Sequence, residues 1–381
     1  MVDKGSLGEK MITRLYVNNY RCLVAFDMKF DSLEVLCGAN GTGKSSVFDA
    51  LKFVCDLAAG RCFLGGQSGD ISNRTVNKLE FCNWLNSTIQ EFELELQTDS
   101  HVFRYIIHIE QSPVYGYGPG IIKEIAYCDS KELYNRDVDG IHFDNNRYGF
   151  PLDWRQAALA SIQPVPERKE IEVLQKALSN LLVVRPNVHS MEFESKAESK
   201  FLNYDLNNII SWYRHLAQDQ EFTDILRKSL QEVWPDLKFL RLADAGMSSK
   251  VLELHFEGSI LPFSCLSDGE KMLVSLYMIH TALVKNISAS VFIDEPDNFV
   301  SLQELQPWLL SMSEITDNSH QVILISHNSE IVDNNPSEGI FFWRDNHMSP
   351  TRAEPLAVPE GMSAGEALAR GWVKPGRKMG E

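Results

Sequence analysis

The sequence has no apolar run long enough to cross a membrane. A spanning helix needs about 20 predominantly apolar residues, and no stretch of the 381 residues approaches that length. The opening "MVDKGSLGEKMITRL" also lacks the apolar core of a secretory signal, so we expect residues 1–10 to form a loose leader before the first strand. These absences predict a cytoplasmic protein without a membrane partner.

Closely paired cysteines are missing as well. The seven cysteines are scattered, with no CxxC pair, whereas zinc sites and thiol redox sites are built from such pairs. Four cysteines stand among apolar residues: Cys37, Cys55, Cys62 and Cys82. We expect these four to be reduced core residues and not disulfide partners or zinc ligands.

Positive charge is scarce. The chain has 36 Lys and Arg residues against 52 Asp and Glu residues, which gives a net charge of −16. Such a surface repels a phosphate backbone, so broad nucleic-acid binding is disfavoured and a protein partner is favoured. A local basic groove would still allow contact with DNA, and the densest basic stretch is the short "VKPGRK" near the C-terminus.

What the sequence does contain is a glycine-rich loop between a strand and a helix. The stretch "GANGTGKSS" follows the apolar run "LEVLC", and its glycines allow a tight turn that presents backbone N–H groups. Lys44 supplies a compact positive charge for terminal phosphates, and Ser45 supplies a hydroxyl for Mg²⁺. The predicted nucleotide-binding residues here are Gly38, Ala39, Asn40, Gly41, Thr42, Gly43, Lys44, Ser45 and Ser46.

A helix is predicted directly after this loop. Its start would add the positive end of a helix dipole to the phosphate site, and Gly60 is a plausible stop. One helical face is apolar and consists of Val47, Phe48, Leu51, Val54, Cys55 and Ala58. Strand, GxxxxGK[ST] loop and helix in this order are the context that the phosphate-binding motif requires.

Patterning divides the chain into four segments. Residues 11–37 suggest two strands, and strict alternation, as in "EFELELQ" with Phe92, Leu94 and Leu96 inward, predicts an antiparallel meander over about 88–145. Helical spacing then predominates, and strand alternation returns in "VLELHF". The predicted segments are a first lobe, a helical insertion, a second lobe and a C-terminal tail, at residues 1–149, 150–236, 237–355 and 356–381.

The stretch "LSDGEK", residues 266–271, is a candidate second anion-binding corner. Ser267, Asp268 and Gly269 stand at the predicted start of a helix, whose N-terminus attracts anions. The alternative is an ordinary helix cap made by Ser267 and Asp268. The helical pattern that follows runs through Met272, Leu276, Ile279 and Leu283.

Two further apolar strands end in polar residues. "SVFIDEP" ends in Asp294, which can hold Mg²⁺ through water, and Glu295, which can orient an attacking water. "VILISHN" ends in Ser326 and His327, and this histidine can reach a γ-phosphate. Taken singly, the Asp294–Glu295 pair is consistent with a surface turn, and His327 with a structural histidine. Their order behind the glycine-rich loop favours a nucleotide site.

On these motifs the chain resembles an ABC-type ATPase of the SMC, RecF and OLD group. It is most similar to the short bacterial "AAA family ATPase" proteins of anti-phage and toxin–antitoxin-like operons, over about residues 11–67 and 261–330. The resemblance implies an α/β P-loop NTPase fold, an ABC/SMC-like head with a mixed β first lobe and a helical insertion. It makes "GANGTGKSS" Walker A, "LSDGEK" the signature, "VFIDEP" Walker B, "DEPDN" the start of the D-loop and His327 the switch histidine.

The same resemblance assigns residues on which the motifs are less clear. Gln67 is the candidate for the Q-loop, with a plain loop glutamine as the alternative. Arg21 is either near the nucleotide or an ordinary surface arginine. Asp268 stands where transporter-type ATPases carry glycine, a position that varies among SMC- and OLD-like members.

The resemblance further implies an ATPase that forms ADP and phosphate. Two chains would enclose ATP and Mg²⁺ as a homodimer or a larger oligomer, with Ser267, Asp268 and Gly269 reaching the nucleotide across the interface. Ser45 and Asp294 would hold the metal. The catalytic residues would be Glu295, His327 and Lys44.

The output of such an ATPase is open at this point. We favour control of a separate effector protein, such as a nuclease or toxin, in anti-phage defence. The alternative is a RecF-like DNA-repair ATPase that clamps duplex DNA. A transporter subunit and a built-in nuclease are less consistent with the chain. The predicted insertion either docks a partner through Trp212 and Tyr213 or buries both in its own core.

Overall fold

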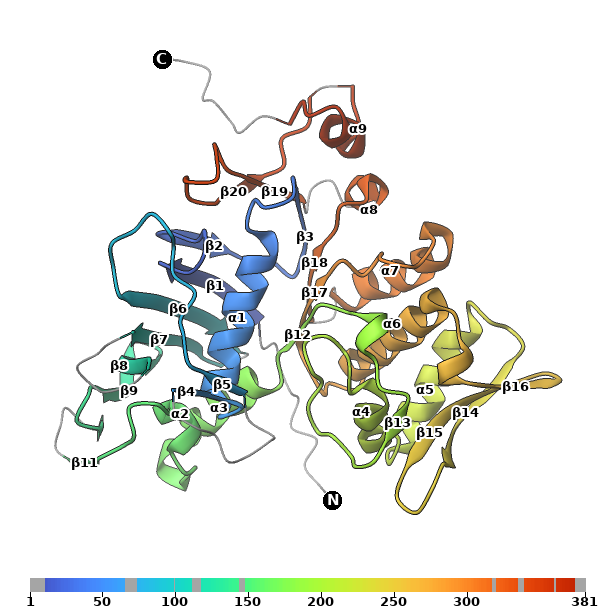
Figure 1. Cartoon of the computed structure of the whole chain (residues 1–381), viewed down its shortest axis with the longest axis horizontal. Coiled ribbons are helices and arrows are strands. Elements are labelled where there is room, and N and C mark those ends of the chain that lie inside the picture. The colour runs from blue at the N-terminus through green and yellow to red at the C-terminus, as the bar shows by residue number, and fades with distance from the viewer. Residues whose placement is uncertain are drawn as a thin grey trace. The chain divides into compact units, whose positions relative to one another are not determined.

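The computed structural model describes residues 11–65, 74–98, 100–111, 118–143, 148–316, 320–334, 339–359 and 361–373, coloured along the chain in Figure 1. The chain forms two compact units. The first unit comprises Met1–Leu181 together with Val332–Glu381, and the second comprises Leu182–Ile331. The boundary at Leu181 falls inside the segment 150–236 that the sequence suggests as a helical insertion.

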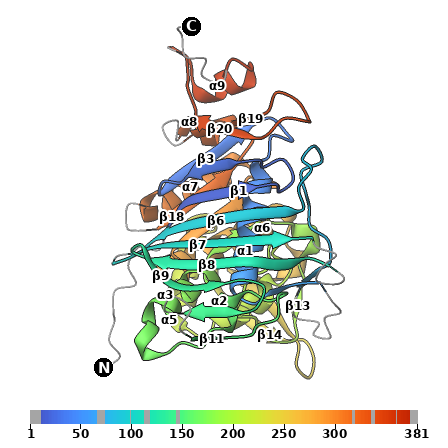
Figure 2. The same ribbon diagram turned by 90° about the vertical axis from the view of Figure 1, so that its left-hand side faces the viewer.

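The first unit contains an antiparallel eight-stranded sheet in the order β11-β10-β9-β8-β7-β6-β1-β2. Figure 2 shows its middle strands edge to edge. The strands are β1 (Met11–Asn18), β2 (Phe26–Lys29), β6 (Ile89–Gln97), β7 (Val102–Glu110), β8 (Gly120–Cys128), β9 (Lys131–Arg136), β10 (Ile141–Phe143) and β11 (Tyr148–Phe150). Each strand from β6 to β10 pairs antiparallel with the next, as the predicted meander requires.

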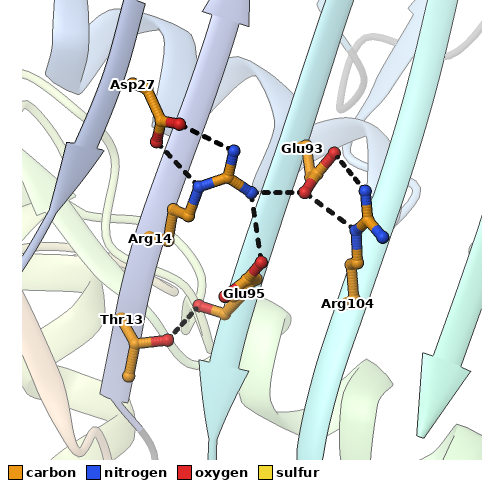
Figure 3. Close-up of polar contacts among 6 residues, drawn as sticks. All are labelled: Thr13, Arg14, Asp27, Glu93, Glu95 and Arg104. Carbon is orange, nitrogen blue, oxygen red and sulfur yellow. Dashed lines mark hydrogen bonds and ion pairs between the residues drawn. The ribbon is translucent and has the colours of Figure 1, made fainter. Parts of the chain in front are cut away.

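Alternation along β6 separates an apolar face from a charged one. Phe92, Leu94 and Leu96 are buried, while the glutamates between them face the other side, because successive strand residues point to opposite faces. Figure 3 shows the charged face, where Arg14 donates from Nε to Asp27 Oδ1 at 2.7 Å and also binds Glu93.

Arg104 completes this ladder of charges across four strands. Its Nε donates to Glu93 Oε1 at 2.8 Å. Desolvation would raise the pKa of Glu93, but the hydrogen bonds from Arg104 and Arg14 outweigh it and lower that pKa. Cross-strand pairs of opposite charge therefore stabilise the register of this face.

Helix α1 (Lys44–Ala58) packs against the buried face of this sheet, and the Phe53 ring meets the Phe92 ring edge-on at 5.7 Å. The predicted apolar face of the helix is buried, and Gly60 follows with a φ of 69°. Burial raises the pKa of the Cys55 thiol to about 12. The four cysteines expected in the core are all buried.

A further group of strands in the first unit positions the glycine-rich loop. β3 (Leu33–Gly38) pairs parallel with β19 (Gly339–Trp343), which pairs antiparallel with β20 (Arg352–Pro355). Residues 11–37 thus hold three strands and not the predicted two, because the stretch "DMKFDSLEVL" is interrupted at residues 30–32 and forms both β2 and β3. Smaller elements are β4 (Cys62–Leu64), β5 (Arg74–Val76), α2 (Ala158–Ser161), α3 (Lys169–Ser179) and α9 (Ala364–Ala369), while α8 (Ser329–Asn334) spans the boundary between the units.

The second unit contains three parallel strands, β12 (Leu182–Val184), β17 (Ser290–Asp294) and β18 (Gln321–Ile325), in the order β12-β17-β18. Helices α6 (Asp268–Val284) and α7 (Leu302–Thr316) contact each other, and Trp308 Nε1 donates to Leu276 O at 3.0 Å between them. β17 and β18 are fully buried, as their continuous apolar sequences predict.

A second, antiparallel sheet completes this unit. Its strands are β13 (Glu194–Ser195), β14 (Leu237–Asp244), β15 (Lys250–Phe256) and β16 (Ser259–Pro262), next to helices α4 (Ile209–Leu216) and α5 (Gln220–Gln231). Trp212 and Tyr213 on α4 are each only 1% exposed, so they fill the core of this unit and are not partner anchors. Among the described helices, none combines the length and hydropathy that a membrane span requires.

Helix α6 carries a buried histidine that should make stability depend on pH. Burial, together with repulsion from His320, lowers the pKa of His280 to about 4, whereas in the unfolded chain it titrates near its ordinary 6.5. Below pH 6.5 the unfolded chain therefore binds a proton that the folded chain does not. This contribution to stability is present above pH 6.5 and is lost as the pH falls towards 4.

We expect the free energy of unfolding to fall by about 3 kcal/mol from this residue over that pH range. Urea unfolding at pH 7 and pH 4.5 measures it, with His280→Leu as the non-titrating comparison, because other groups also titrate. The pH-dependent loss should be smaller in the variant. An equal loss in both proteins would contradict the assignment.

Candidate functional site

The glycine-rich loop connects the end of β3 to the start of α1. Gly38, Gly41 and Gly43 have φ values of 136°, 76° and 105°, in the left-handed region that favours glycine. Space is also restricted at Gly43, where an added Cβ would lie 2.3 Å from Thr351 Oγ1. The loop therefore needs glycine both for its conformation and for the close approach of the C-terminal segment.

Lys44 lies across this loop. Its Nζ donates to Gly38 O at 2.8 Å and to Ala39 O at 3.0 Å, and the residue is 4% exposed. Ser45 and Ser46 follow in the first turn of α1 and are half-buried. A fixed cation beside the N-terminal N–H groups of a helix suits a phosphate, because both the charge and the helix dipole attract anions.

Residues from the C-terminal segment hold the loop in place. Thr351 Oγ1 donates to Thr42 O at 2.8 Å, and Arg344 Nη1 donates to Gly41 O at 3.1 Å. These supports were not predictable from the sequence, because no local pattern distinguishes two polar residues about 300 positions downstream. The pairing of β3 with β19 brings them to the loop.

Two further residues of the first unit were predicted to lie near the nucleotide. Arg21 binds the carboxylates of Asp49 and Glu80, which supports the interpretation of Arg21 as a structural surface residue. Gln67 lies outside the described residues.

The signature stretch forms the capped start of α6. Ser267 Oγ accepts from Glu270 N at 3.3 Å, and Glu270 Oε2 accepts from Ser267 N at 2.7 Å, which is a capping box. Because Ser267 Oγ acts as an acceptor here, its O–H can still donate outward, and the residue is exposed. A Cβ on Gly269 would lie 2.8 Å from Phe299 O, so only glycine lets the segment after β17 approach the helix start this closely.

Asp294, the last residue of β17, is 1% exposed. Its Oδ2 lies 3.5 Å from Arg185 Nε. The register explains this ion pair, because Val184 is opposite Ile293 in the parallel β12–β17 ladder and Arg185 therefore follows β12 at the same edge. Arg185 was not predicted as a site residue, because the sequence of β12 continues the helical pattern that precedes it.

Glu295 and His327 meet at the ends of neighbouring parallel strands, as their positions after β17 and β18 predict. His327 Nε2 lies 3.7 Å from Glu295 Oε1. Asn298 Nδ2 donates to Glu295 Oε2 at 2.6 Å. Burial raises the pKa of nearby Asp297, against the opposing effect of a hydrogen bond with Ser326.

Comparison with known proteins agrees with these motifs. A family model described as "AAA domain, putative AbiEii toxin, Type IV TA system" matches residues 35–333. A search of curated proteins found no match.

Solved structures of SMC heads resemble the chain. The SMC head bound to the C-winged helix domain of ScpA is 14% identical, with a TM-score of 0.57 over 91% of this chain and 98% of that chain. The SMC head domain with an extended coiled coil, bound to the C-terminal domain of ScpA and derived from Pyrococcus furiosus, is 13% identical, with a TM-score of 0.54 over 91% of this chain and 96% of that chain.

These likenesses confirm the predicted fold, a mixed α/β P-loop NTPase fold of the SMC-head type. The family model also confirms the predicted relationship to AAA-family proteins of toxin–antitoxin-like systems. Because the family model spans most of the sequence, the chain belongs to the AAA-domain family described as putative AbiEii toxin of type IV toxin–antitoxin systems.

Proposed function

We propose that this protein binds ATP with Mg²⁺ and hydrolyses it to ADP and phosphate. The proposal rests on the position of Lys44. Its Nζ donates hydrogen bonds to the carbonyl oxygens of Gly38 and Ala39, where α1 begins. A compact cation fixed beside a helix N-terminus provides both features that bind a terminal phosphate.

Each unit offers an oxygen of the kind that magnesium prefers. Ser45 in the first unit has a hydroxyl at the start of α1, and Asp294 in the second unit has a carboxylate at the end of β17. Mg²⁺ takes such hard oxygen ligands together with phosphate oxygens and water. When bound, the ion would neutralise charge on the β- and γ-phosphates.

Glu295 is the proposed general base. It takes a proton from water as the water oxygen bonds to the γ-phosphorus and the bond from that phosphorus to the ADP oxygen breaks. His327, whose Nε2 lies 3.7 Å from Oε1 of the same carboxylate, would hold the water or the γ-phosphate. Catalysis is then mainly positioning and electrostatic stabilisation.

We also propose that ATP is enclosed between two copies of the chain. The exposed start of α6 would face the nucleotide of the partner, where Ser267 can donate its O–H. Such a dimer would control a separate effector, a nuclease or toxin. The family description, which names a toxin–antitoxin system, is consistent with a role in anti-phage defence.

The dimer makes a direct prediction. Light scattering should show about twice the monomer mass with ATP and Mg²⁺, and the monomer mass with ADP, because only the γ-phosphate links the two subunits. Ser267→Ala removes this donor together with the cap of α6, so a variant that circular dichroism shows to be folded should have a smaller ATP-dependent fraction. A mass that is the same in ATP and ADP would contradict the proposal.

A further inference from the structure

We propose that Asn298 is a positioning residue that fixes the Glu295 carboxylate so that Oε1, and not Oε2, receives the proton from water. This inference rests on the proposed function. It concerns only the second unit, where strands β17 and β18 end side by side.

The backbone first brings Glu295 out of the buried strand. Asp294 pairs with Ile325 at the end of the ladder, and Glu295 N donates to Ile325 O at 2.8 Å. At Glu295 the backbone turns left-handed, with a φ of 56°. A non-glycine residue rarely adopts this conformation unless its surroundings enforce it, and here β18 does so.

The two carboxylate oxygens of Glu295 have different partners. Oε2 accepts the amide N–H of Asn298 at 2.6 Å, while Oε1 faces His327 Nε2 at 3.7 Å. A hydrogen bond to an ionised group is stronger than one between neutral groups, so it favours one rotamer of Glu295 over its alternatives. Oε1 is therefore the oxygen presented, next to His327, to a water molecule.

Asn298 is held in turn by its own backbone. Its N–H donates to Glu295 O at 3.2 Å, so main chain and side chain together form a closed turn around the carboxylate. An amide can donate here without adding another negative charge beside Glu295 and Asp297. Asn298 is exposed, so the hydrogen bond, and not packing, is what its replacement removes.

Two variants separate the hydrogen bond from the shape of the side chain. Asn298→Ala removes the side chain, and Asn298→Asp keeps its shape but has no N–H to donate. Asn203→Ala is the matched control, because Asn203 is an exposed asparagine of the same unit whose side chain binds Asn207.

Both Asn298 variants should lower kcat about 10-fold, because a general base that is not held in one orientation is less often in position to accept the proton from water. KM and the equilibrium affinity for ATP should stay within about 2-fold of wild type. Asn203→Ala should change neither. In nucleotide-free crystals of Asn298→Ala, the Glu295 carboxylate should leave the orientation that it has in wild type.

A double mutant tests whether Asn298 acts through Glu295. In Glu295→Gln, adding Asn298→Ala should cause no further loss of rate. A further loss, or a weaker ATP affinity in Asn298→Ala, would overturn the inference, and so would wild-type kcat in either single variant or an unmoved carboxylate. If Glu295→Gln itself hydrolyses at the wild-type rate, the proposed role of Glu295 fails instead, which distinguishes the two failures.

Discussion

Replacing Lys44 by alanine should abolish tight ATP binding and turnover. Lys44 Nζ is the compact charge held over the loop by Gly38 O and Ala39 O, and alanine leaves the β- and γ-phosphates without it. We expect ATP affinity to fall by about 100-fold or more, since several kcal/mol of charge-assisted hydrogen bonding are lost. Titration with a fluorescent ATP analogue and a phosphate-release assay measure the two effects.

The control for this experiment is Lys29→Ala, which removes an exposed lysine from β2 of the same unit and should leave both quantities unchanged. Circular dichroism checks that Lys44→Ala still folds, because the lysine also bonds the loop carbonyls. Unchanged affinity and turnover in a folded Lys44→Ala protein would refute the assignment of the phosphate site.

Glu295→Gln should retain ATP binding and slow hydrolysis by about 100-fold or more. Glutamine keeps the shape of the side chain but cannot accept the proton of the attacking water, and general bases contribute about 10²–10⁴-fold. The variant should therefore accumulate the ATP-bound state, and the ATP-dependent increase in mass should persist for longer than in wild type.

Glu304→Gln is the matched change, because Glu304 is an exposed glutamate of the same unit at the start of α7. Its ATPase rate should equal that of wild type. If Glu295→Gln also hydrolyses ATP at the wild-type rate, Glu295 is not the base.

Elements with a strong local pattern were predictable from the sequence. The alternation around Phe92 and Leu94 identified β6, and the apolar face that includes Val47 and Leu51 identified α1. β12 was not predictable in this way. Its residues Leu182–Val184 continue the apolar spacing of the preceding helix, and they form a strand only because β17, more than 100 residues later, pairs with them.

The candidate site likewise contains features that local sequence patterns predict and features that depend on distant segments of the chain. The meeting of Glu295 and His327 was predictable, because parallel strands present their carboxyl ends at one edge. The ion pair of Arg185 with Asp294 and the support of Thr42 by Thr351 depend on register and on distant chain segments. Ser267 is a third case. The sequence "LSDGEK" predicts both a helix cap and a phosphate contact for this residue, and the structure shows the cap.

The first unit is formed by two separate segments of the chain, Met1–Leu181 and Val332–Glu381. This affects the order in which its parts can fold during synthesis on the ribosome. Val35 in β3 pairs with Gly339 in β19. At a translation rate of roughly 5–20 residues per second, Gly339 is synthesised about 15–60 s after Val35. The second unit is one continuous segment, Leu182–Ile331, and is translated completely in that interval. The glycine-rich loop gains its supports from Arg344 and Thr351 only afterwards, so in a nascent chain the proposed nucleotide site is among the last features to form.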